Sequence, residues 1–195
     1  NQLKSAGKKI KVAFLLRDAY LPAEVTKAIA KHDVGKLVRI SRFSAYAASF
    51  SSEEEVRQYV MDNASSERFD DIGKQLLLPE KIRASLTAEA KAAEKPAACY
   101  MQAISRNYVM KAILQASQQY RQRFFKHLQS ELQLENDDTL VFVDLGYTGT
   151  AQNKLTPIFR KEFNIDIYGC YLIALHTPKW QNNRAGLLNP ACCDD

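Results

Sequence analysis

The chain has 195 residues, of which 46% are hydrophobic and 25% are charged, and its formal net charge is +5. This composition is typical of a globular domain and excludes disordered, collagen-like and coiled-coil proteins. No apolar run reaches the roughly 18 residues that a membrane-spanning helix needs. We therefore expect that this chain is not a membrane protein. The positive charges are dispersed along the chain, which favours a small phosphorylated ligand over a nucleic acid.

The start of the chain and its cysteines bear on its cellular setting. The sequence begins Asn-Gln-Leu-Lys, with no initiator methionine and no leader of the secretory type. We therefore expect a piece of a longer protein that is located in the cytoplasm. The four cysteines form no C-x-x-C pair and are predicted to be reduced thiols (Cys99, Cys170, Cys192, Cys193).

The first part of the chain predicts a strand, a turn and a helix. An apolar run over residues 10–16 stops abruptly at Arg17 and Asp18, and from Pro22 the apolar residues recur at helical spacing. A second short strand is expected over residues 37–40, followed by Ser41 and Arg42.

Residues 51–138 differ from both ends of the chain because they contain no convincing strand run. They open with Ser51-Ser-Glu-Glu-Glu, a helix-start signature, and Pro96 breaks a helical stretch rich in alanine. We predict that this segment is a helical insertion or cap. Near-helical spacing after Pro96 predicts a buried stripe of Met101, Ile104, Tyr108, Leu114, Tyr120, Phe124 and Leu128.

The clearest strand of the chain covers residues 139–143 and enters Asp144. A helix over residues 151–163 and a strand over residues 167–175 are expected to follow. Two β-loop-α units imply parallel strands joined by right-handed crossovers. The sequence therefore predicts one α/β domain over residues 1–195, with a Rossmann-like parallel sheet whose ligands bind at the carboxyl ends of the strands.

The loop from Asp144 to Thr150 carries the most chemical information. A strand brings a carboxylate to the edge of the sheet, and a Thr-Gly-Thr turn then opens a helix whose first N–H groups lack partners within the helix. These donors and the helix dipole attract anions. Gly149 allows close approach of the backbone to a phosphate, and the hydroxyls of Thr148 and Thr150 add donors. Helix capping by Thr150 is the alternative explanation.

This loop resembles the diphosphoribosyl-diphosphate loop of the type I phosphoribosyltransferases. The resemblance rests on Asp144, Thr148, Gly149 and Thr150, and it implies a glycosyl-transfer site in a phosphoribosyltransferase-like fold. It further implies that Arg17 and Asp18 belong to a diphosphate loop after the first strand. Val143 departs from the pattern, because these enzymes usually carry a second acidic residue there, and the second threonine comes one place early.

A closer resemblance is to the domain found downstream of HAD-family hydrolase domains in predicted bacterial surface-polysaccharide proteins. Three segments carry it: the Arg17-Asp18-Ala-Tyr20 turn, the Ser41-Arg42 pair, and the loop that runs from Asp144 through Gly146 and Gly149 to Gln152. The resemblance implies an upstream hydrolase domain in the longer protein. A HAD active site within this chain is not expected, because Gly146 stands where that chemistry needs a second carboxylate.

Together these patterns predict a site at one edge of the sheet, and they leave its activity open. The expected ligand is a phosphorylated sugar or nucleotide-sugar. The expected catalytic residues are Asp144, Arg17 and Asp18, with a divalent cation such as Mg²⁺ as the candidate cofactor. The expected ligand-binding residues are Gly146, Tyr147, Thr148, Gly149, Thr150 and Arg42. An enzyme of the phosphoribosyltransferase type and a noncatalytic accessory domain of a HAD hydrolase both fit.

Overall fold

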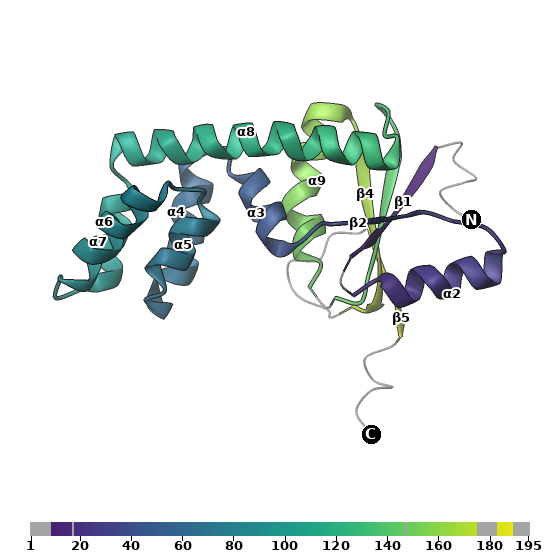
Figure 1. The fold of residues 1–195 in the computed structure, drawn as a ribbon, viewed down its shortest axis with the longest axis horizontal. Coiled ribbons are helices and arrows are strands. Elements are labelled where there is room, and N and C mark those ends of the chain that lie inside the picture. The colour runs from purple at the N-terminus through teal and green to yellow at the C-terminus, as the bar shows by residue number, and fades with distance from the viewer. Residues whose placement is uncertain (1–8, 17, 147, 175–182, 189–195) are drawn as a thin grey trace, which may run out of the picture. The chain divides into compact units, whose positions relative to one another are not determined.

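A computed structural model describes residues 9–16, 18–146, 148–174 and 183–188 of the chain (Figure 1). The chain divides into two compact units. The first unit consists of residues 1–45 and 125–195, and the second consists of residues 46–124. The helical insertion predicted over residues 51–138 overlaps this second unit from residue 51 to residue 124. The boundaries of the unit lie within helices α3 (Arg42–Ser49) and α8 (Asn107–Leu132).

The first unit contains a five-stranded, all-parallel sheet, which confirms the predicted α/β, Rossmann-like class. The strand order is β2-β1-β3-β4-β5, and Val12 of β1 pairs with Val141 of β3 at the centre. The chain passes from β1 to β2 on one side and then returns to β3 on the other, so the strand order reverses between β1 and β3. The strands are β1 (Ile10–Leu15), β2 (Lys36–Val38), β3 (Thr139–Asp144), β4 (Asp166–Ile173) and β5 (Arg184–Leu188).

Two helices connect neighbouring strands of this sheet. Helix α2 (Tyr20–Ala30) joins β1 to β2, and α9 (Thr150–Phe163) joins β3 to β4. Figure 1 shows α9 alongside the strands. Aromatic rings anchor it, because the ring centroid of Phe125 lies 4.4 Å from that of Phe159 and 4.5 Å from that of Phe163. This packing fixes the helix whose N-terminus follows the Asp144–Thr150 loop.

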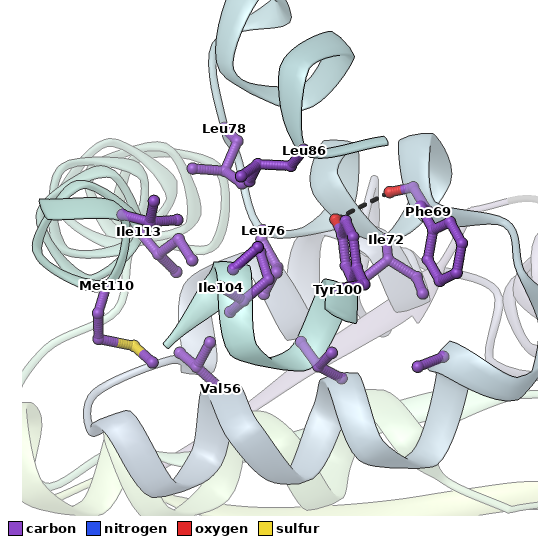
Figure 2. Close-up of a cluster of buried hydrophobic side chains, with 14 of the residues drawn as sticks. Val56, Phe69, Ile72, Leu76, Leu78, Leu86, Tyr100, Ile104, Met110 and Ile113 are labelled. Carbon is purple, nitrogen blue, oxygen red and sulfur yellow. Dashed lines mark hydrogen bonds between the residues drawn. The ribbon is translucent and has the colours of Figure 1, made fainter. Parts of the chain in front are cut away.

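The second unit is helical, and its residues 46–124, all of which the structure describes, contain no strand. Figure 2 shows its apolar core, in which the hydroxyl of Tyr100 donates a hydrogen bond of 2.9 Å to the carbonyl oxygen of Phe69. The helices lying wholly within this unit are α4 (Glu53–Asn63), the short 3₁₀ helix η1 (Ala64–Ser66), α5 (Phe69–Gln75), α6 (Glu80–Lys91) and α7 (Pro96–Ile104).

Several element boundaries differ from the prediction. The helical stretch is interrupted before Pro96, as expected: α6 ends at Lys91, and Pro96 is the first residue of α7. The predicted apolar stripe after Pro96 is wrong at Tyr108, which is 61% exposed, because the chain breaks between α7 and α8 and the helical phase is not continuous. Strand β5 was not expected from the sequence. Among the described helices, none combines the length and the apolar character that crossing a bilayer requires.

Candidate functional site

A pocket of about 430 Å³ opens at the carboxyl ends of β1, β2 and β3. This is the edge where the strand order reverses, and open parallel sheets bind ligands at that position. The turn after each of the three strands contributes to the wall. The described residues that line the pocket are Leu15, Leu16, Asp18, Ile40, Ser41, Arg42, Phe43, Asp144, Gly146, Thr148, Gly149, Thr150, Ala151 and Tyr171.

The structure brings most of the predicted site residues together in this pocket. Seven of them line it: Asp18, Arg42, Asp144, Gly146, Thr148, Gly149 and Thr150. The other two, Arg17 and Tyr147, lie outside the described residues. Segments more than 100 positions apart in the sequence therefore meet at one sheet edge, as parallel strands require.

The N-terminus of α9 has no side-chain cap. Gly149 is the N-cap residue, with a left-handed φ of 59°, and as a glycine it has no side chain that could accept a hydrogen bond from the first turn. The hydroxyl oxygens of Thr148 and Thr150 lie 3.1 Å apart and interact with each other. The alternative that Thr150 caps the helix is therefore wrong. The first-turn amides of Thr150 and Ala151 remain as donors at the pocket wall.

The carboxylate of Asp144 is half-buried at the end of β3 and lies over the turn that follows. A methyl group on Gly146 would come within 2.9 Å of its Oδ2 atom, so the glycine leaves room for the carboxylate. Burial raises the pKa of the nearby Tyr171 hydroxyl above its usual value; the positive charge of Arg184 opposes this increase, and the negative charge of Asp144 adds to it. Asp144 thus lies within electrostatic range of the pocket wall formed by β4.

The turn after β2 supplies the opposite side of the pocket. Ser41 and Ser44 fix the start of α3, because the Ser44 amide donates to Ser41 Oγ at 3.1 Å and the Ser41 amide donates to Ser44 Oγ at 2.8 Å. Arg42 is the first residue of α3 and is exposed in the pocket. A guanidinium at this position can bind a phosphate or carboxylate through paired hydrogen bonds.

Asp18 and Asp144 are the residues of this pocket that could hold a magnesium ion. Mg²⁺ in proteins is commonly held by one or two carboxylates together with substrate phosphate oxygens and water. Asp18 and Asp144 supply that number of carboxylates beside a candidate phosphate site. In the part of the chain that the structure describes, no group of three or more His, Cys, Asp or Glu side chains forms an all-protein metal site.

Sequence reasoning missed the residues that support the loop from behind. Arg184 of β5 donates from Nη1 to the carbonyl oxygen of Thr148 at 3.1 Å, and Tyr171 of β4 donates to Gln152 Oε1 at 2.9 Å. Gln152 belonged to the motif, but no role was predicted for it. The sequence contained no indication of the role of Arg184, because the five-residue, mostly exposed edge strand that contains it shows no clear hydrophobic periodicity.

Comparison of the chain with protein-family models and with curated proteins gave no match. The resemblance to the phosphoribosyltransferases therefore remains a prediction, and it rests on the residues of the Asp144–Thr150 loop. The parallel sheet and the pocket at its switch point are compatible with that prediction, although many unrelated functions share this architecture. The function must be argued from the site.

Proposed function

We propose that this protein binds a phosphorylated sugar or nucleotide-sugar in the pocket beside the Asp144–Thr150 loop. One observation carries the proposal: the N-cap residue of α9 is a glycine, which offers no capping side chain, and the start of this helix lines the same pocket as a strand-end carboxylate. Unpaired amides and the positive end of the helix dipole favour a phosphate. The carboxylate favours the hydroxyl groups of a sugar. The two features together match a ligand that has both groups.

Each part of the ligand has a distinct set of partners in this proposal. Phosphate oxygens accept hydrogen bonds from the amides of Thr150 and Ala151 and from the two threonine hydroxyls, and Arg42 balances their charge. Asp144 accepts hydrogen bonds from sugar hydroxyls. Asp18 and Asp144 would hold Mg²⁺ together with phosphate oxygens, and the ion would supply charge neutralisation at the phosphates.

Transfer of the sugar is the activity that the resemblance to phosphoribosyltransferases adds to binding. In that reaction, diphosphate leaves from the anomeric carbon and an acceptor replaces it through a cationic sugar transition state. Asp144 would stabilise the positive charge, since a fixed carboxylate beside developing charge lowers the barrier. Arg17, which lies outside the described residues, would hold the diphosphate.

A second candidate is a noncatalytic binding domain that serves a HAD-family hydrolase in surface-polysaccharide biosynthesis in the cytoplasm. The residue before Asp144 favours this noncatalytic candidate. Val143 pairs with Phe14 and Cys170 inside the sheet, so the loop has one strand-end carboxylate instead of the usual two. A site with a single carboxylate is adequate for ligand binding, whereas transfer makes greater demands on charge stabilisation.

Calorimetry with diphosphoribosyl diphosphate and Mg²⁺ tests the proposal. The wild-type protein is expected to bind, and Asp144→Asn is expected to bind at least about tenfold more weakly, which corresponds to about 1.4 kcal/mol. Asp33→Asn is the matched control, because Asp33 pairs with Lys27 and does not line this pocket. Absence of binding by the wild-type protein would refute the proposal.

Two further measurements separate the candidate activities. Release of diphosphate in the presence of candidate acceptors would support transfer, whereas binding without release would favour the noncatalytic domain. Salt-sensitive binding to random oligonucleotides would instead indicate a nucleic-acid protein. We expect no such binding, because the positive charges are dispersed in the sequence.

A further inference from the structure

Gln152 connects the first turn of α9 to the two strands at the edge of the sheet. Its side chain is fully buried, and its amide nitrogen donates to the carbonyl oxygens of Ile167 at 3.2 Å and Asn183 at 3.0 Å. Its Oε1 atom accepts from the hydroxyl of Tyr171 at 2.9 Å and from Nε of Arg184 at 3.0 Å. Each polar atom of this buried amide is therefore satisfied, as burial requires.

The guanidinium of Arg184 holds both the loop and the helix. Its Nη1 atom donates to the Thr148 carbonyl oxygen at 3.1 Å, and its Nη2 atom donates to Oδ1 of Asn153. With the bond from Nε to Gln152, each of its three nitrogens contacts a different residue of the segment 148–153. The rigid fork of an arginine makes several such bonds at once and loses little entropy in doing so.

Glycine at two positions makes this close contact possible. A methyl group on Gly149 would lie 2.9 Å from Cζ of Arg184 and 2.9 Å from the hydroxyl oxygen of Tyr171. A methyl group on Gly169 would collide with Oε1 of Gln152. The guanidinium therefore packs directly on the backbone of the N-cap residue of α9.

Arg184 is not among the described residues that line the pocket. It instead bonds to Thr148 and packs against Gly149, and both of these residues line the pocket. Its guanidinium carries a positive charge. A fixed positive charge thus lies directly against the backbone turn that we propose binds phosphate.

We infer that Arg184 is a positioning residue for ligand binding. It holds residues 148–153 in the conformation that presents the α9 amides, and it adds a permanent positive charge near the bound phosphate. Gln152 and Tyr171 orient the guanidinium. This inference rests on the proposed function, because it concerns the same pocket. It goes further by making the affinity depend on a strand that contributes no described residue to the pocket lining.

The test compares three variants by calorimetry with diphosphoribosyl diphosphate and Mg²⁺ at two ionic strengths. Arg184→Gln is expected to lose at least about tenfold in affinity and to show a weaker dependence of affinity on salt, because a charge near the phosphate is lost. Arg184→Lys keeps the charge but loses the fork, so its affinity is expected to fall less and its salt dependence to remain. Arg160→Gln is the control, since Arg160 lies in the last turn of the same helix and pairs with Asp166.

The possible outcomes distinguish the inference from the proposed function. If the wild-type protein does not bind the probe, both fail. If the wild-type protein binds and Arg184→Gln binds within twofold of it, the inference is wrong while the proposed function stands. Where Arg184→Gln does not fold, Asn153→Ala removes one anchor of the guanidinium and is expected to weaken binding several-fold. Unchanged affinity in that variant would equally overturn the inference.

Discussion

Replacing Gln152 with leucine is expected to destabilise the sheet unit by about 3 kcal/mol. Leucine has a similar volume, so the cavity that it leaves is small and the lost hydrogen bonds dominate. Two of the four bonds join fully buried groups, the Ile167 carbonyl and the Tyr171 hydroxyl. A buried group left without a partner costs about 1–3 kcal/mol. The Asn183 carbonyl and Arg184 are less buried and can regain part of their hydrogen bonding from water.

Urea unfolding followed through the amide NMR signals of β3 and β4 measures this loss in the sheet unit alone. With a slope of about 2 kcal/mol per molar urea, the midpoint is expected to fall by about 1.5 M. Thr156→Val is the matched control one turn further along α9. The Thr156 hydroxyl donates to the Gln152 carbonyl at 2.7 Å, but that carbonyl lies within the helix, so the expected loss is below about 1 kcal/mol. Equal midpoints for the two variants would refute the reasoning.

Three further changes test other parts of the structure. Gly149→Ala is expected to cost about 1–3 kcal/mol in urea unfolding, because the residue has a left-handed φ of 59° and its methyl group would crowd Arg184 and Tyr171; wild-type stability would contradict this. Ser52→Ala removes the capping box that Ser52 forms with Glu55 at the start of α4, so thermal unfolding should show a loss of about 1 kcal/mol. Burial raises the pKa of Tyr59 from 10.0 to about 12, so the folded state keeps a proton that the unfolded state releases, and stability falls between these values as pH rises. Urea midpoints at about pH 8 and about pH 11 should differ less in Tyr59→Phe than in the wild-type protein, and equal differences would contradict this cause.

The sequence predicted the strands that form the centre of the sheet because they are short, apolar and end abruptly. The run before Asp144 ends in the structure at that carboxylate, and the run before Arg17 ends one residue earlier than the apolar pattern. The meeting of Asp144 with Asp18 and Arg42 followed from a single rule, that the carboxyl ends of parallel strands lie on one edge. This part of the site could therefore be predicted without knowing any side-chain contact.

The support behind the loop could not be predicted, because it depends on contacts between distant parts of the chain. Gln152 and Arg184 are 32 positions apart and meet only when β5 pairs with β4. The sequence around Arg184 is short and irregular, so it indicated neither a strand nor a charge directed at the loop. Similarly, the exposure of Tyr108 depends on where the chain breaks between two helices, which periodicity alone did not locate.

The central claim is that the first-turn amides of α9 bind phosphate. Titration of a nitrogen-15-labelled sample with inorganic phosphate and then with diphosphoribosyl diphosphate, followed through the backbone amide signals, tests it most directly. The account predicts that the signals of Thr150, Ala151 and Gln152 shift most and saturate together. The start of α5 is the internal control, because it also has no side-chain cap but carries Asp70 and Asp71 in its first turn. Shifts that are absent at α9, or equal at both helices, would contradict the claim.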